Sequence, residues 1–223
     1  MRLRVRYGAG ALASKAALAV TLAWGQPATA EQVHILALGD SLTQGYGLLE
    51  SEGFVPQLRA WLAARGHDVR IVNGGVSGDT TAGGLARVEW SLTPEIDAMI
   101  VTLGGNDLLR GIDPAVARGN IEGILKVAQA RELEVLLVGM QAPGNYGPDY
   151  KAAFEAIYPE LAESYGTLLA GNFFDGLMED GAAPADLDAF MQADGIHPNE
   201  DGVARIVETL GPQVEALIAQ ASE

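Results

Sequence analysis

Apolar residues gather in five short runs along the chain, separated by longer segments in which polar positions recur. Each run is rich in Val, Ile or Leu. The runs occupy residues 33–38, 69–72, 98–103, 135–138 and, more weakly, 167–170. Short runs that stay apolar at successive positions are typical of strands covered on both faces of a sheet. The pattern therefore predicts five buried strands.

Segments with the spacing of amphipathic helices lie between and after these strands. They occupy residues 54–64, 82–92, 114–131, 148–165 and 198–221. Strands that alternate with helices favour a parallel sheet with helices on both faces. We therefore expect an α/β fold of the three-layer α/β/α sandwich type.

Three prolines refine the helix boundaries. Asp113 stands directly before Pro114 and can cap a helix that starts at the proline, and Pro198 could start the last helix in the same way. Pro159 lies inside the fourth predicted helix, where a proline removes a backbone hydrogen bond. We expect Pro159 to kink or end that helix.

The N-terminal segment differs from the rest of the chain. Arg2, Arg4, Arg6 and Lys15 precede an apolar stretch over residues 16–24, and small residues follow at 28–30. This pattern predicts a secretory signal peptide over residues 1–30 and a periplasmic or secreted mature chain that begins at Glu31. A retained anchor is the alternative, but the stretch is shorter than the about 20 residues that span a bilayer. Residues 31–223 suit one domain, with no membrane span after removal of the signal.

The composition of the chain limits the classes of partner that it can bind. The formal net charge is −15. All charged residues of the predicted signal are basic, so the mature chain carries a still larger negative charge. Such a surface disfavours nucleic acid and anionic membranes. The sequence has no cysteine, so the core must suffice without a disulfide. His34, His67 and His197 share no metal-ligand spacing, and we expect no metal and no cofactor.

The segment Gly39-Asp40-Ser41-Leu42 directly follows the first predicted strand. This position places Ser41 at the carboxyl end of a parallel strand, where such folds bind ligands. A serine hydroxyl becomes an effective nucleophile only beside a base that an acid orients. Ser41 is therefore a candidate nucleophile, and the alternative is a capping residue for the next helix.

His197 can supply this base, and Asp194 can supply the acid that orients it. A carboxylate three residues before an imidazole can fold back onto its Nδ1 in one tight turn and fix its tautomer. Pro198 disfavours the helical region for His197 and places it on the loop before the last helix, free to face the crevice. The alternative is a histidine packed at a helix start, with the acid capping the turn.

Four segments follow strand ends and should rim one crevice: residues 39–47, 73–81, 104–111 and 140–147. Acyl transfer needs hydrogen-bond donors directed at the oxygen that becomes negative, and the Gly78 N–H and the Asn106 amide suit this task. Alternatively, Gly78 is a turn glycine that needs a positive φ, and Asn106 is a turn or left-handed residue after Gly104 and Gly105.

Four short motifs together resemble the blocks of the SGNH, or GDSL, hydrolase family, in order and spacing across the mature chain. They are Gly39-Asp40-Ser41-Leu42, Ser77-Gly78-Asp79, Gly104-Gly105-Asn106-Asp107 and Asp194-Gly195-Ile196-His197-Pro198. Within the family, the chain is most similar to the bacterial periplasmic esterases of the arylesterase, acyl-CoA thioesterase I and lysophospholipase type. The resemblance implies a flavodoxin-like sheet, commonly of strand order 2-1-3-4-5.

The same resemblance implies roles for the residues in these motifs. Ser41 would be the nucleophile, His197 the general base and acid, and Asp194 its orienting carboxylate. The N–H groups of Ser41 and Gly78 and the Asn106 amide would form the oxyanion hole. The reaction would be two-step transfer of an acyl group from an ester or thioester to water, without metal or cofactor.

Residues 142–147 resemble the substrate loop of these esterases, which implies substrate contacts from Pro143, Asn145 and Tyr146. We expect Tyr146 to build an apolar acyl groove, flanked by Leu48, Leu49 and Leu109. The alternative is that these leucines complete the core, which we favour for Leu108 or Leu109. A secreted enzyme does not meet cytosolic acyl-CoA, so lysophospholipids and other soluble or lipid esters are the expected substrates.

Two alternative functions stay open. A carbohydrate O-deacetylase would use the same four motifs on short acetyl esters. A non-catalytic module could hold an anion on the glycine-rich turns at Gly74, Gly75 and Gly78. The sequence lacks the glycine-rich phosphate motifs, and its negative charge disfavours such binding.

Overall fold

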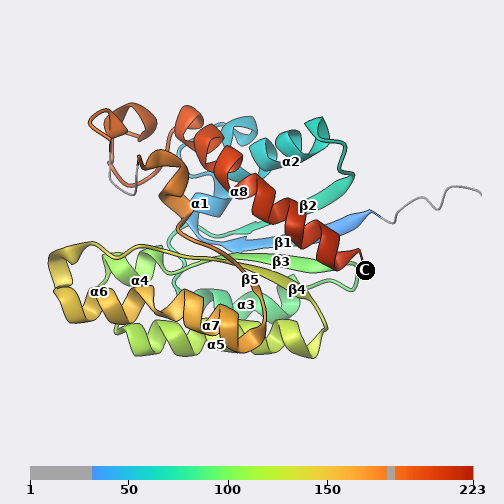
Figure 1. The fold of residues 1–223 in the computed structure, drawn as a ribbon, viewed down its shortest axis with the longest axis horizontal. Helices are drawn as coiled ribbons and strands as arrows, with labels where there is room; N and C mark the ends of the chain where they lie inside the picture. Colours follow the sequence, from blue (N-terminus) through green and yellow to red (C-terminus); the bar gives the residue numbers. More distant parts are fainter. Residues whose placement is uncertain (1–31, 180–183, 223) are drawn as a thin grey trace, which may run out of the picture. The chain divides into compact units, whose positions relative to one another are not determined.

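Five parallel strands form the central sheet of the computed structural model, which describes residues 32–179 and 184–222 (Figure 1). The predicted signal peptide, residues 1–30, lies outside the described residues. The strand order is β2-β1-β3-β4-β5, which confirms the expected flavodoxin-like order. The strands are β1 (Val33–Gly39), β2 (Val69–Gly75), β3 (Ala98–Thr102), β4 (Glu134–Val138) and β5 (Leu168–Ala170).

β2 extends three residues beyond the predicted end at residue 72. Asn73, Gly74 and Gly75 pair in register with residues 37–39 of β1. A side chain at Gly75 would collide with the backbone of Gln44, so the strand passes this close to the turn after β1 only because the residue is a glycine. A polar and glycine-rich strand end does not resemble a buried apolar run.

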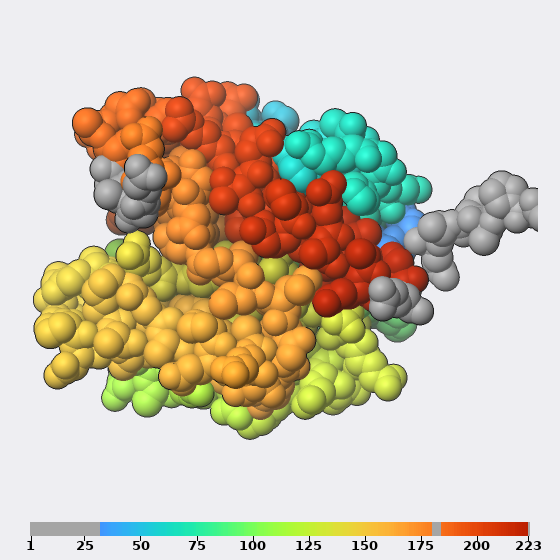
Figure 2. Space-filling model, viewed as in Figure 1, coloured from blue at the N-terminus to red at the C-terminus, as the bar shows by residue number. Residues whose placement is uncertain are grey.

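Helices cover both faces of the sheet and confirm the three-layer sandwich. One face carries two helices that pack against each other, α2 (Phe54–Ala64) and α8 (Glu200–Ala221). Figure 2 shows the atoms of α8 lying against those of α2. The other face carries α3 (Thr81–Ser91), α5 (Pro114–Ala130), α6 (Pro148–Glu155) and α7 (Ile157–Tyr165). None of the helices in the described ranges is long and apolar enough to cross a bilayer.

The core lies between these layers, and the strands supply its centre. Ile35, Leu38, Ile100 and Leu137 are buried almost completely. Burial of such side chains stabilises a fold by roughly 1.5–3 kcal/mol each. These apolar contacts hold the strands in place. The polar loops of the pocket follow the carboxyl ends of the same strands.

Helix starts follow their caps, with one correction. α5 begins at Pro114 as predicted, and the Asp113 carboxylate accepts a hydrogen bond from the Ala115 N–H at 2.9 Å. α8 does not begin at Pro198. It begins at Glu200, because the Asn199 side chain accepts a hydrogen bond from the Gly202 N–H at 3.0 Å and caps the helix.

The fourth predicted helix is two helices, α6 and α7, that meet at Ala156. Pro159 lies in the first turn of α7. It has no N–H to donate to the carbonyl of Glu155, so the hydrogen-bond ladder cannot continue from α6. The expected kink or end therefore falls before Pro159.

Candidate active site

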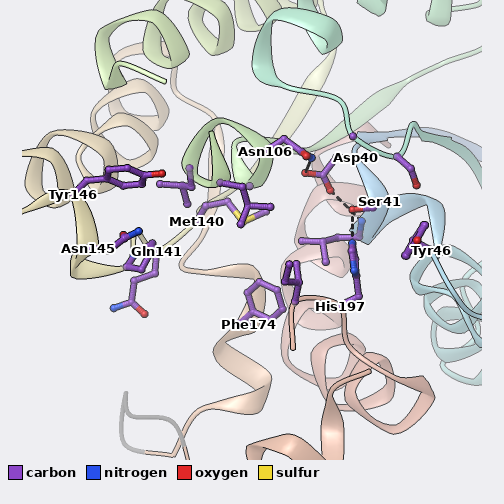
Figure 3. A pocket seen from close by; sticks show the side chains of 18 residues that line it. Asp40, Ser41, Tyr46, Asn106, Met140, Gln141, Asn145, Tyr146, Phe174 and His197 are labelled. Atoms are coloured by element: carbon purple, nitrogen blue, oxygen red, sulfur yellow. Dashed lines mark hydrogen bonds between the residues drawn. The ribbon is translucent and has the colours of Figure 1, made fainter. Parts of the chain in front are cut away.

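A pocket of about 400 Å³ opens at the carboxyl ends of β1, β3 and β4 (Figure 3). The loops that follow these strands form most of its wall, together with the loop before α8. At one end lie Ser41, His197 and Tyr46, and at the other lies Tyr146. The pocket therefore combines residues that are far apart in the sequence.

Ser41 is the first residue of a short helix, α1 (Ser41–Gln44), that follows β1. The cap of this helix is Asp40, whose Oδ1 accepts a hydrogen bond from the Leu42 N–H at 3.0 Å. The alternative in which Ser41 caps the helix is therefore wrong. The Ser41 hydroxyl instead lies 2.8 Å from Nε2 of His197.

Asp194 holds the other side of the imidazole. Its Oδ2 lies 2.7 Å from Nδ1 of His197, and its Oδ1 accepts hydrogen bonds from the N–H groups of Ile196 and His197 at 2.9 and 3.0 Å. The backbone N–H of His197, followed by its side chain and the Ile196 N–H, lowers the pKa of Asp194 from 3.8 to about 2. Asp194 thus stabilises the turn and also binds the imidazole, so the two interpretations of this acid both hold.

Gln192 connects the histidine loop to the serine loop. Its backbone N–H donates to the carbonyl of His197 at 2.8 Å. Its side-chain nitrogen donates to the carbonyls of Tyr46 and Pro198 at 2.8 and 3.0 Å. The Tyr46 ring lies beside the His197 ring, with 4.7 Å between centroids. Neither Gln192 nor Tyr46 stood out in the sequence, because each acts through a contact between distant segments.

Gly78 lines the pocket with a φ of 82°, so the interpretation as a turn glycine is right about its backbone. The turn is closed by a hydrogen bond from the Asp79 N–H to the Val76 carbonyl at 3.0 Å. Arg110 holds the Gly78 carbonyl at 2.8 Å from its Nη2. Within residues 32–179 and 184–222, the N–H groups of Ser41 and Gly78 have no protein acceptor and remain available to a ligand.

Asn106 is the second residue of α4 (Gly105–Leu109). The helix begins directly after Gly104, whose φ is 122°. Asn106 itself is helical, so the interpretation as a left-handed residue is wrong. Its Nδ2 donates to Oδ2 of Asp40 at 3.2 Å. Asp40 is buried, and this burial raises the pKa of its carboxyl from 3.8 to about 6.

The predicted substrate-loop residues Pro143, Asn145 and Tyr146 line the pocket. The Tyr146 ring packs against Gly111 and lies 4.9 Å, between centroids, from the Tyr150 ring. These contacts fix the ring at the far end of the pocket, and 42% of Tyr146 remains exposed.

The four leucines near the predicted groove are distributed between core and pocket differently from the prediction. Leu108 is buried, as favoured for one of the pair, while Leu109 is 59% exposed; both line the pocket. Leu48 packs against the core and Leu49 faces a separate hollow, so the prediction that they flank the groove is wrong.

Three apolar residues of the pocket did not emerge from the sequence as candidates. Met140 follows β4, Phe174 lies in a short 3₁₀ helix over residues Phe173–Leu177, and Ile196 lies within the histidine motif. Figure 3 places Met140 and Phe174 between the His197 and Tyr146 ends. Met140 lies in the segment 140–147 that was expected to rim the crevice, and Ile196 stands beside His197. A single 3₁₀ turn is too short for a periodic pattern to mark Phe174.

The site has the polar groups for proton transfer and an apolar wall for an organic chain. In the part of the chain that the structure describes, no three His or acidic side chains are grouped so that they could hold a metal ion. A nucleophile, a base and an orienting acid in hydrogen-bond contact are the arrangement used for acyl transfer.

Comparison with known proteins agrees with this chemistry. Residues 37–205 match the GDSL-like Lipase/Acylhydrolase family. Esterase TesA of Pseudomonas aeruginosa is 40% identical over 185 residues, which cover 82% of this chain and 89% of that protein. Thioesterase 1/protease 1/lysophospholipase L1 of Escherichia coli is 36% identical over 185 residues, covering 82% of this chain and 84% of that protein.

Similarity extends to three dimensions. The crystal structure of AlinE4, an SGNH-hydrolase family esterase, matches with a TM-score of 0.68 and 43% sequence identity, and covers 83% of this chain and 96% of that chain. Fold, family match and relatives agree, and they identify the class of reaction as hydrolysis of small-molecule carboxylic esters. This chain therefore belongs to the GDSL-like lipase/acylhydrolase family and is a carboxylic-ester hydrolase.

Proposed function

We propose that this chain is a secreted serine esterase in which Ser41, His197 and Asp194 form the catalytic triad. The observation that carries the proposal is the continuous chain of hydrogen bonds from Ser41 through His197 to Asp194, with distances of 2.8 and 2.7 Å, at the end of an apolar pocket. The pattern of residues 1–30 supports secretion.

In the first step, Ser41 Oγ forms a bond to the carbonyl carbon of the ester while His197 Nε2 takes the hydroxyl proton. His197 then gives that proton to the leaving oxygen or sulfur as its bond to the carbonyl carbon breaks. The acyl group remains on Ser41. Asp194, whose pKa is about 2, stays ionised and stabilises the charged imidazole.

In the second step, His197 takes a proton from water as the water oxygen attacks the acyl carbon. The bond to Ser41 breaks, Oγ regains its proton from His197, and the carboxylic acid leaves. In both steps the carbonyl oxygen becomes negative. The N–H groups of Ser41 and Gly78 and the Asn106 amide are proposed to donate to this oxygen.

The pocket supports esters with a medium or long acyl chain. The leaving group must lie beside His197, which protonates it, so the acyl chain extends away from His197 toward Met140, Asn145 and Tyr146. Leu109 and Pro143 also line the pocket. We propose aryl esters, acyl thioesters and lysophospholipids as substrates; thioesters and lysophospholipids agree with the name of the Escherichia coli relative.

The test is hydrolysis of p-nitrophenyl acetate, butyrate, octanoate and palmitate, and of lysophosphatidylcholine, by the chain from Glu31. Ser41→Ala should abolish turnover, while Ser164→Ala, at an exposed helical serine, should leave it unchanged. If a folded Ser41→Ala variant kept the turnover of the wild type, Ser41 would not be the nucleophile. Activity on acetyl esters alone would favour a carbohydrate O-deacetylase, and no ester hydrolysis at all would favour an anion-binding module.

A further inference from the structure

Asp40 is a buried carboxylate that the proton transfers described above do not use. Only 1% of its surface is exposed. One carboxylate oxygen accepts a hydrogen bond from the Leu42 N–H, next to the nucleophile, and the other accepts from Nδ2 of Asn106. These two partners lie on the short helices α1 and α4, which follow β1 and β3. Asp40 therefore connects the nucleophile turn to the amide proposed for the oxyanion hole.

The amide of Asn106 has two ends of opposite character. Its nitrogen donates two hydrogen bonds and its oxygen only accepts, and rotation of the amide by half a turn exchanges them. An ionised carboxylate only accepts. Facing Asp40, the amide oxygen would meet another acceptor at about the 3.2 Å that now separates donor and acceptor. In a buried site such a contact is strongly unfavourable.

We propose that Asp40 is a positioning residue of the oxyanion hole, which holds the Asn106 amide with its nitrogen directed at the carbonyl oxygen of the bound ester. One N–H of Asn106 binds Asp40, and the second remains free to donate into the pocket. Asp40 does not touch the substrate. It acts through the orientation of Asn106, and the inference rests on the proposed function above.

The charge on Asp40 fits this task above neutral pH. Burial raises the pKa of its carboxyl to about 6, and the charge of Asp107 also raises it. The hydrogen bonds from Leu42 and Asn106 and the charge of His197 lower it. At pH 8 the carboxylate is therefore ionised and can only accept.

A double-mutant cycle separates this role from the capping of α1. The four proteins are wild type, Asp40→Asn, Asn106→Ala and the double variant, compared by kcat and KM on p-nitrophenyl butyrate at pH 8. Asn at position 40 keeps the shape and one capping oxygen. Its NH₂ group faces Asn106, however, and therefore favours the rotated amide, with the oxygen directed into the hole.

We expect Asn106→Ala to lower kcat by about 10²- to 10³-fold, the typical loss of one oxyanion donor. Asp40→Asn should lower kcat by at least about tenfold with little change in KM. In the Asn106→Ala background, Asp40→Asn should have almost no further effect, because no amide is left to orient. An equal loss in both backgrounds, or no loss from Asp40→Asn alone, would overturn the proposal.

Asp40→Ser gives a second, independent variant. Serine retains a capping oxygen for the Leu42 N–H but cannot hold Asn106. Asp40→Ser should lower kcat as Asp40→Asn does, and again only when Asn106 is present. A wild-type kcat in a folded Asp40→Ser variant would count against the positioning role. The Ser41→Ala control separates the two proposals, because turnover that survives it overturns the serine mechanism, whereas the cycle tests only Asp40.

Discussion

Asp194 binds the His197 side chain through one carboxylate oxygen and the backbone of the same turn through the other. The same side chain therefore shapes the loop and orients the imidazole. This double contact links the stability of the loop to the tautomer of His197. It also determines how changes at Asp194 should affect activity and stability.

Replacing Asp194 with asparagine should lower kcat strongly while KM changes little. The change leaves the imidazole without a negative partner and favours the wrong tautomer; for a serine-protease triad such a change costs roughly 10⁴-fold. The Asp194 side chain is 36% exposed, so water can replace part of its effect. We expect a loss of about 10²- to 10³-fold. Asp188→Asn, at an exposed position, is the matched control, and an Asp194→Asn variant with wild-type kcat would contradict the role.

The same variant has an expected pH signature in stability. The pKa of Asp194 is lowered from 3.8 to about 2 in the folded chain, so its stabilising contribution is fully present above pH 4. The contribution is lost as the pH falls through about 2. The difference in the free energy of unfolding between wild type and Asp194→Asn should shrink as the pH falls from 4 through about 2. Urea unfolding at each pH measures it, and a difference that does not shrink below pH 4 would contradict the prediction.

Asp40 should have the opposite pH signature. Its pKa is raised to about 6 by burial, so the folded chain binds this proton more tightly than the unfolded chain, in which the pKa is near 3.8. Ionisation then destabilises the fold as the pH rises from 4 through 6, by up to on the order of 3 kcal/mol. Asparagine does not ionise. Relative to wild type, Asp40→Asn should therefore gain stability between pH 4 and 8, and a pH-independent difference in urea unfolding would contradict this.

Tyr146→Ala should change the preference for acyl-chain length. The substitution removes an aromatic wall at the end of the pocket farthest from His197, which an acetyl group does not reach. We expect kcat/KM for octanoate to fall about tenfold, with acetate nearly unchanged, since loss of apolar contact in a pocket costs about 1–3 kcal/mol. Tyr165→Ala, at a tyrosine bonded to Glu122, is the control. Equal losses on acetate and octanoate would remove Tyr146 from the groove.

Two glycines in helices should respond to alanine in opposite directions. Gly119 in α5 has no neighbour within 4 Å of an added Cβ, so alanine should stabilise the fold by up to about 1 kcal/mol. In α8, a Cβ on Gly211 would lie 2.5 Å from the Trp61 ring. Gly211→Ala should destabilise the fold by about 1–3 kcal/mol despite the better helix propensity. Urea midpoints of both variants test the pair, and a stabilised Gly211→Ala would contradict the packing.

The fold could be predicted because its strands are continuous apolar runs and its helices are periodic. Errors fall where polar residues decide the boundary. β2 continues through Asn73 and Gly75, which carry no strand signal, because β1 offers hydrogen bonds and only a glycine fits beside Gln44. α8 starts after Pro198 because Asn199 is the cap, and two adjacent start signals compete there.

That the candidate site residues come together could be predicted as far as local motifs reach. Ser41, Asp194 and His197 stand in short segments whose chemistry is visible without a fold. Asp40 is different, since its contact with Asn106 joins residues 66 positions apart and depends on how two loops meet. Phe174 likewise faces the pocket from a short turn that no periodic pattern marks.

The side chain of Gln192 has a consequence for turnover. It bridges the carbonyl of Tyr46, on the serine side, and the carbonyl of Pro198, on the histidine side. The folded chain itself therefore holds the Ser41 loop beside the His197 loop. For the proposed nucleophile and base, the entropy of bringing the two groups together is lost once, when the chain folds, and is not lost again in each catalytic cycle.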